Sequence, residues 1–192
     1  MTVRLRDCFF GHWDIPPDSE ERLREADGVV THEFGDQEHV SATTRDIVLR
    51  AVEVATALGK PMMCQYPGNR VAVAHGVTPV YTIRENLLNP GKYLDTEGVN
   101  YQVAMECLRL GWKTVVVVTT SDHLWRAGKN LERYGIEVRY PKTRDIAYDW
   151  RLLFTWRPWR GLLAVRSLFR ARERYARYLY RKNGYFTPIA SK

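Results

Sequence analysis

The sequence predicts an α/β fold, a Rossmann-like open parallel sheet flanked by helices, with a basic helix at the C-terminal end. Short apolar segments alternate along residues 26–141 with longer segments whose apolar positions recur every three to four residues. The connections between them are short enough for parallel crossovers. Residues 113–119, Lys-Thr-Val-Val-Val-Val-Thr, are apolar on both faces, as central strands of parallel sheets are.

The first half of the chain contains two predicted helices and two predicted strands. In order, these are a short charged helix at 18–25, a buried strand at 26–31, an amphipathic helix at 41–58 and a strand at 61–66. The pair Pro67-Gly68 ends the second strand, because both residues are typical of turns.

The second half continues the alternation. In order, it contains a weaker strand at 77–83, a loop at 84–93, a helix at 96–110, the central strand at 113–119, a helix at 123–134, a strand at 136–140 and a long helix at 161–182. Gly111 and Gly135 follow two of these helices and predict their C-terminal ends.

We expect one domain over residues 1–192, with a core at 26–141 and a helical extension at 142–192. The net charge of +7 belongs to the extension: residues 151–192 hold 11 basic residues and one acid, whereas residues 1–150 hold 18 basic and 21 acidic residues. A basic segment can bind nucleic acid, anionic lipid or phosphate groups. The commoner role of such a helix is to pack on a sheet with its charges in water, so we do not expect a nucleic-acid surface.

The composition is that of a globular protein, with 45% hydrophobic and 27% charged residues. The three cysteines, Cys8, Cys64 and Cys107, form no Cys-x-x-Cys pair, which argues against a disulfide framework or a zinc knuckle. The longest apolar run, residues 115–118, is far too short for a membrane span. These features favour a cytoplasmic protein.

Ligands of open parallel sheets bind beyond the carboxyl ends of the strands, where loops meet helix N-termini. Three polar loops occupy such positions, at residues 32–39, 94–97 and 119–123. We expect them to converge on one small-molecule pocket.

The third loop is the most informative. Thr120, Ser121 and Asp122 are good N-cap residues, and a helix start offers unpaired amides to an anion. His123 and Arg126 are three residues apart and so share one helix face. Together they suit a phosphate or carboxylate, with His123 able to carry a proton. A purely structural role, in which one residue caps the helix and the others make internal hydrogen bonds, remains equally open.

The second loop also allows two interpretations. Asp95 or Thr96 can cap the following helix, and Glu97 in its first turn suits the helix dipole. Alternatively, Glu97 and Asn100 reach into the pocket and bind ribose hydroxyls or an amine. Capping is the commoner role for residues in these positions.

The first loop contains a cluster of possible metal ligands. These are His32, Glu33, Asp36, Glu38 and His39. Their spacing matches no known metal-binding motif, and we expect no metal. A role for Glu33 or Gly35 in ligand binding needs no metal.

Several segments resemble the YdcF-like family, which includes the SanA and ElyC proteins. The segments are TVVVVTTSDHLWRAGKNLERYGIEV at 114–138, DTEGVN at 95–100, ADGVVTHEFG at 26–35 and WRPWRGLLAVRSLFRARERYARYLY at 156–180. The resemblance covers about residues 26–183, and Ser121 to Ala127 carry its most specific motif. This chain departs from the family in having one glycine, Gly35, in its first loop and Asp95 where the family has Asn, and it lacks the anchor of the SanA and ElyC branches.

The resemblance implies a Rossmann-like fold and, for the soluble branch, binding of S-adenosylmethionine. Glu33 and Glu97 would then bind hydroxyls or the amine, and His123 with Arg126 the anionic end. The remaining pocket residues would be Gly35, Asp95, Thr96, Asn100, Thr120 and Ser121.

Two alternatives stay open. The second hypothesis is a hydrolase or transferase that acts on a phosphorylated or glycosyl substrate, with Glu97 or His123 as general base and Arg126 stabilising developing charge. The third hypothesis is a nucleic-acid-binding module that works through the C-terminal helix.

Overall fold

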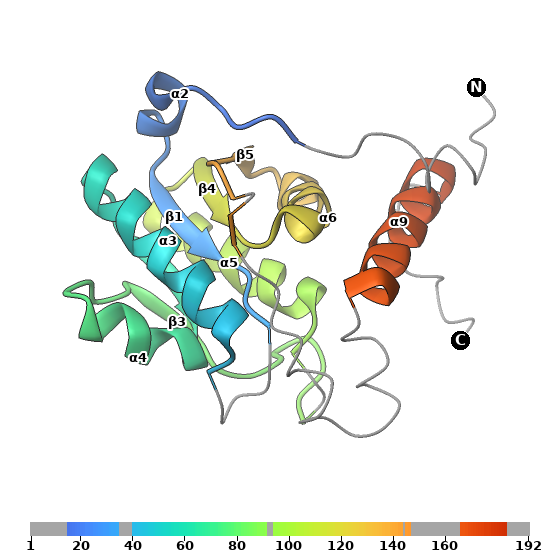
Figure 1. Ribbon diagram of the computed structural model, residues 1–192, viewed down its shortest axis with the longest axis horizontal. Coiled ribbons are helices and arrows are strands. Elements are labelled where there is room, and N and C mark those ends of the chain that lie inside the picture. The colour runs from blue at the N-terminus through green and yellow to red at the C-terminus, as the bar shows by residue number, and fades with distance from the viewer. Residues whose placement is uncertain (1–14, 35–39, 92–93, 144, 147–165, 184–192) are drawn as a thin grey trace. The chain divides into compact units, whose positions relative to one another are not determined.

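The computed structural model describes residues 15–34, 40–91, 94–143, 145–146 and 166–183. Within them lies a five-stranded parallel sheet with the strand order β3-β2-β1-β4-β5 (Figure 1). The strands are β1 Gly28–Thr31, β2 Met62–Gln65, β3 Tyr81–Ile83, β4 Thr114–Val118 and β5 Glu137–Arg139. The predicted Rossmann-like open parallel sheet is confirmed.

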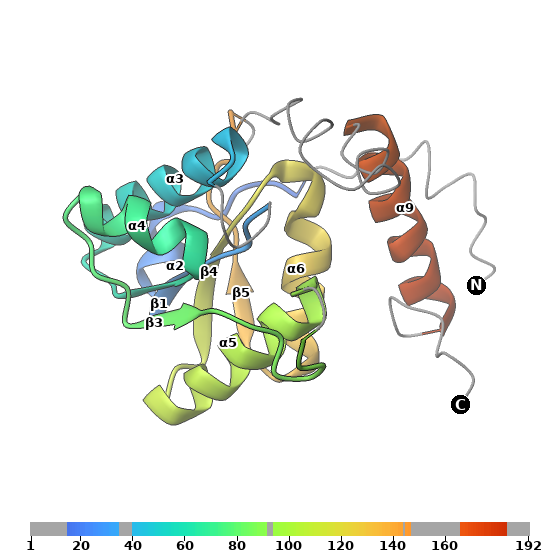
Figure 2. The ribbon, with the colours of Figure 1, turned by 90° about the horizontal axis from the view of Figure 1, so that it is seen from below.

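Helices cover both faces of the sheet. They are α2 Glu20–Arg24, α3 Ala42–Leu58, α4 Tyr66–Ala74, α5 Thr96–Leu110 and α6 Ser121–Arg133. Figure 2 shows α3 and α4 on one side of the strands and α5 on the other, and the packing places α6 with α5. Successive strand residues alternate between the two layers: Val29 packs with α3 and α4, whereas Val30 packs with α5 and α6. The central strands β1 and β4 are thus buried on both faces.

The structure differs from the sequence prediction in the segment after β2. The pair Pro67-Gly68 does not form a turn but lies in the first turn of α4, a helix that the local sequence does not predict. Proline is compatible with the first turn because the N–H groups there have no partner within the helix. In α6 the helix begins at Ser121, two residues before the predicted start, and Tyr134 rather than Gly135 is the C-cap residue.

Other boundaries follow the local signals. The helix α5 has the predicted bounds, with Gly111 at its C-cap in the left-handed conformation (φ 73°). Ser41 caps α3 by accepting a hydrogen bond from the Thr44 N–H at 3.0 Å. Caps of this kind fix where a helix starts and ends.

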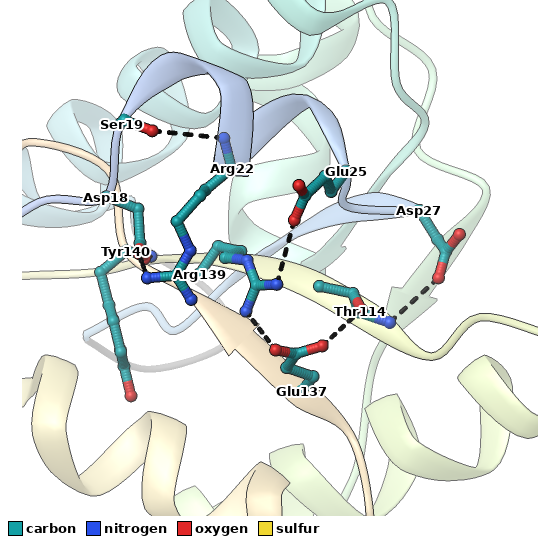
Figure 3. A network of polar contacts seen from close by, with 9 residues as sticks. All are labelled: Asp18, Ser19, Arg22, Glu25, Asp27, Thr114, Glu137, Arg139 and Tyr140. Carbon is teal, nitrogen blue, oxygen red and sulfur yellow. Dashed lines mark hydrogen bonds and ion pairs between the residues drawn. The ribbon is translucent and has the colours of Figure 1, made fainter.

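The segment that precedes β1 is tied to β4 and β5 by charged side chains (Figure 3). Arg139, whose side chain is 7% exposed, pairs with Glu137 at 2.5 Å and with Glu25 at 3.3 Å. The Asp18 carboxylate accepts from the Tyr140 N–H at 2.8 Å, and the Asp27 carboxylate accepts from Thr114 N–H at 3.0 Å. These groups bind one another or the backbone, which indicates a structural role.

The chain divides into two compact units, residues 15–149 and residues 1–14 with 150–192. In the second unit the structure describes α9, Arg166–Asn183, which carries six arginines and one lysine against a single acid, Glu173. The first five residues of the predicted helix at 161–182 lie outside the described residues. Among the helices that the structure describes, none has the length and apolar character needed to cross a membrane.

Candidate functional site

The carboxyl ends of β1 and β4 lie side by side where the order of the strands reverses. From β1 the chain continues to β2 on one side, and from β4 it continues to β5 on the other. The loops after the two strands are joined: the His32 N–H donates to Val118 O at 3.1 Å, and Thr119 Oγ1 donates to His32 O at 2.7 Å. Small molecules bind at this position in open parallel sheets, which makes it the candidate site.

Side chains from three elements surround the imidazole of His123 in the first turn of α6. Its ring centroid lies 5.8 Å from that of His32 and 5.5 Å from that of Phe34, both in the loop after β1. Its Nε2 lies 3.5 Å from Thr96 Oγ1 at the start of α5, and its Nδ1 lies 3.4 Å from the guanidinium of Arg126. The spacing in sequence predicts a shared helix face for His123 and Arg126, and the structure brings them into contact.

Three buried residues at this junction carry polar atoms that make no hydrogen bond within the described part of the chain. The atoms are Nε2 of His32, Oδ1 and Nδ2 of Asn100, and Oγ1 of Thr120, on residues that are at most 4% exposed. A buried polar group without a partner costs about 1–3 kcal/mol, and native proteins retain few of them. A ligand that supplies the missing partners would offset this cost.

His32 is held in its neutral form. Burial lowers the pKa of His32 well below its ordinary value, and the neighbouring His123 and Arg126 lower it further. The Asn100 side chain acts in the opposite direction on this pKa, although no hydrogen bond of ordinary geometry joins the two residues. A neutral imidazole has one N–H donor and one acceptor nitrogen, so His32 suits an uncharged polar group rather than an anion.

Glu33, the next residue, faces the other side of β1. One carboxylate oxygen accepts from Thr31 Oγ1 at 2.7 Å and from Gln65 N–H at 2.9 Å, and the other accepts from Gly68 N–H at 2.9 Å. Removal from water raises the pKa of Glu33 to about 7, and the hydrogen bonds oppose this shift only in part. The structure therefore places Glu33 as a cap on the start of α4, away from His123.

The predicted residues at the start of α5 divide between two locations. Asp95 is the N-cap and accepts from the Gly98 N–H at 2.8 Å, while Thr96 faces His123. Glu97 instead accepts a hydrogen bond from the Tyr134 hydroxyl at 2.8 Å, beyond the last residue of α6. Burial and this bond raise the pKa of Tyr134 to about 12. Tyr134 follows His123 by 11 residues and is the C-cap residue of α6, so the Glu97 carboxylate is bound by a residue from the other end of that helix.

Part of the predicted first loop lies outside the described residues, namely Gly35, Asp36, Glu38 and His39. His32 and Glu33, which remain, face opposite sides of β1. No group of three potential metal-ligating side chains occurs among the residues that the structure describes.

Sequence reasoning does not select His32 or Phe34 as ligand-binding residues. For His32, the signal is the alternation of side chains along β1, continued past the end of the strand, whereas Phe34 also packs against the layer of α3 and α4 and is not selected by this pattern. Because Val30 faces α5 and α6, His32 faces the same side and Glu33 the opposite one. In the sequence, His32 stands out only as one of several possible metal ligands, a role that we do not expect, and the alternation is not used to assign it.

Comparison of the chain with protein-family models, with curated proteins and with solved structures finds no match. The resemblance to the YdcF-like family therefore stays a prediction.

Proposed function

We propose that this protein binds an adenosyl or nucleotide-like small molecule at the junction of β1 and β4, with S-adenosylmethionine as the first candidate. The observation that carries the proposal is the set of buried polar atoms on His32, Asn100 and Thr120 that lack partners within the described residues. They come from three separate elements at the edge of the sheet where ligands of this fold bind.

The chemistry of these atoms suits an adenosyl group. The amide of Asn100 presents a donor and an acceptor side by side, an arrangement that matches the donor and acceptor edge of adenine. The neutral ring nitrogen of His32 can bind a ribose hydroxyl or a further ring nitrogen. The rings of Phe34 and His123 add apolar and aromatic surface next to them.

A transfer reaction is compatible with this ligand. S-adenosylmethionine supplies a methyl group whose bond to sulfur breaks, leaving the electron pair on sulfur, as the acceptor's lone pair forms the new bond. His123 would take up the proton that the acceptor releases, at Nδ1, because this nitrogen faces a guanidinium, which can only donate, and so carries the lone pair of the neutral ring. Arg126, in contact with Nδ1 of the same ring, would bind the carboxylate of the ligand.

A second candidate is hydrolysis or transfer on a phosphorylated or glycosyl substrate. The contact between His123 and Arg126 favours it, because a base beside a guanidinium is a common arrangement for phosphate chemistry. Of the two bases predicted from sequence, His123 is the one that lies at the junction, since Glu97 faces Tyr134.

The test is a thermal-shift and calorimetric titration with S-adenosylmethionine, ATP and sugar phosphates. A ligand at 100 times its Kd stabilises the folded protein by about 2.7 kcal/mol, which is readily measured as a rise in Tm. We expect the adenosyl compounds to stabilise the protein and Asn100→Leu to abolish the effect.

Asn130→Leu is the matched control. Asn130 is also a buried asparagine whose amide oxygen has no partner among the described residues, but it lies about 10 Å further along α6 than His123. The variant should bind like the wild type. Absence of stabilisation by every adenosyl compound would refute the first proposal, and consumption of a stabilising sugar phosphate would establish the second.

A further inference from the structure

Four of the described helices begin at the carboxyl edge of the sheet, and in three of them the protein supplies an oxygen to the first turn. Ser41 caps α3 and Asp95 caps α5, each by accepting from a first-turn N–H, at 3.0 and 2.8 Å. In α4 the oxygens come from Glu33, in the loop after β1. In α6 the N-cap residue, Thr120, makes no side-chain capping bond.

The hydroxyl of Thr120 is a second, independent feature at the start of α6. Threonine in this position ordinarily accepts a hydrogen bond from an N–H of the first turn. Here Oγ1 is buried, on a residue that is 4% exposed, and it makes no hydrogen bond within the described residues. Thr120 directly precedes the first turn of the helix, so a ligand bound at the helix start would meet its hydroxyl together with the backbone N–H of Ser121.

The charges near this turn favour an anion. The start of a helix carries a partial positive charge, and Arg126 follows one turn later with its guanidinium 3.4 Å from His123 Nδ1. The Asp122 carboxylate also lies in the first turn, and both Asp122 and Arg126 have further interactions within the protein. A cation and oriented donors therefore stand on the side of α6 that faces the candidate site.

We infer that the start of α6 is an oxyanion subsite, in which Thr120 Oγ1, the Ser121 N–H and the Arg126 guanidinium hold a phosphate or carboxylate group of the ligand. The inference rests on the proposed function for the remainder of the ligand and adds the class of its charged end. The ligand is thus an adenosyl compound that carries an anionic group, not a neutral nucleoside.

Matched pairs of ligands test the subsite and identify the anion. AMP and adenosine differ by a phosphate, and S-adenosylmethionine and its decarboxylated analogue differ by a carboxylate. Isothermal titration of the full chain gives the affinity ratio within each pair, and ³¹P NMR titration follows inorganic phosphate alone. We expect the anionic member of at least one pair to bind the wild type tenfold more tightly or better.

The variants remove single donors without disturbing the helix. Thr120→Val deletes the hydroxyl, which makes no hydrogen bond within the described residues, and Thr120→Ser keeps it. Ser121→Pro deletes one N–H at the first helical position, where proline is favoured, and the extended backbone of Thr120 (φ −64°, ψ 147°) suits a following proline. Ser121→Ala keeps that N–H.

Thr120→Val and Ser121→Pro should reduce the affinity ratio to within about threefold of unity, while Thr120→Ser and Ser121→Ala retain it. A wild-type ratio near one in both pairs, or a ratio that neither Thr120→Val nor Ser121→Pro changes, overturns the subsite even if adenosine binds. Binding of inorganic phosphate with the same dependence on the variants supports the subsite even if every adenosyl compound fails. If inorganic phosphate also fails to bind, both the subsite and the proposed function are overturned.

Discussion

Polar side chains on the two sides of β1 differ in their hydrogen bonding. His32 and Glu33 are adjacent in the chain and, because strand side chains alternate, they face different layers of helices. The Glu33 carboxylate accepts three hydrogen bonds from protein groups. Across the sheet, His32 Nε2 and both amide atoms of Asn100 make none within the described residues.

This contrast separates a structural polar group from one that is available to a ligand. Glu33 joins β1, β2 and the start of α4, so its bonds are part of the fold. His32 and Asn100 are buried to the same degree as core residues, yet Nε2 of His32 and the amide of Asn100 find no hydrogen-bond partner in the part of the chain that the structure describes. Substitutions on the Glu33 side should therefore change stability, and those on the Asn100 side should change ligand binding.

The largest expected effect is that of Glu33→Ala. Loss of the carboxylate leaves the N–H groups of Gln65 and Gly68 without their acceptor, which should lower the free energy of unfolding by about 3–4 kcal/mol. Urea denaturation followed by circular dichroism measures the loss. Glu53→Ala is the control, since Glu53 is 65% exposed and its ion pair with Arg50 should be worth less than about 1 kcal/mol. Equal effects of the two variants would contradict a structural role for Glu33.

Glu33 should also give the stability a pH dependence. Its pKa in the folded protein is about 7, above the ordinary 4.5, so the folded state binds the proton more tightly than the unfolded state does. Between these two values, rising pH therefore destabilises the wild type relative to Glu33→Gln, by up to about 3 kcal/mol in total. Denaturant titrations of both proteins at pH 5, 6, 7 and 8 test the sign. A difference that is constant or that grows in favour of the wild type with pH would rule this out.

Local sequence signals predict some elements of this fold well and cannot predict others. The run of valines predicts β4, and Asp95 and Gly111 predict the two ends of α5. The helix α4 is missed because Pro67-Gly68 is typical of a turn, and because its capping residue, Glu33, lies more than 30 residues earlier in the chain. The contact that stabilises the start of α4 is thus tertiary.

The residues of the candidate site likewise include some whose contacts the local sequence predicts and others whose contacts it cannot predict. The three-residue spacing of His123 and Arg126 predicts their contact, because helix geometry alone determines it. Glu97 and Asn100 have the same spacing, yet Asn100 is buried and interacts with His32, while the Glu97 carboxylate accepts a hydrogen bond from the Tyr134 hydroxyl. The direction of a long side chain depends on the neighbouring helix, about which the local sequence says nothing.

Gly68→Ala tests how closely Glu33 approaches α4. A Cβ atom at this position would lie 2.4 Å from Glu33 Oε1, so the carboxylate must move and weaken its bonds. We expect a loss of about 1–3 kcal/mol in the free energy of unfolding. In the double variant with Glu33→Ala the clash is absent, so the two losses should not add. Strict additivity in urea denaturation would show that the two residues do not interact.

The smallest expected effect on stability is on the other side of β1, at Asn100→Leu. Leucine has nearly the same shape as asparagine and removes two buried polar atoms that lack partners, so the free energy of unfolding should stay unchanged or rise by about 1 kcal/mol. The same variant should lose ligand binding, and this combination is the signature of a residue kept for function at the expense of stability. Gln102→Leu is a fitting comparison, because Gln102 lies on the same helix but donates to Glu85 O at 2.6 Å, and its loss should destabilise the protein. If Asn100→Leu instead destabilises the protein as much as Gln102→Leu does, the Asn100 amide has partners in the folded chain. That result would contradict the proposal that the junction of β1 and β4 is a binding site.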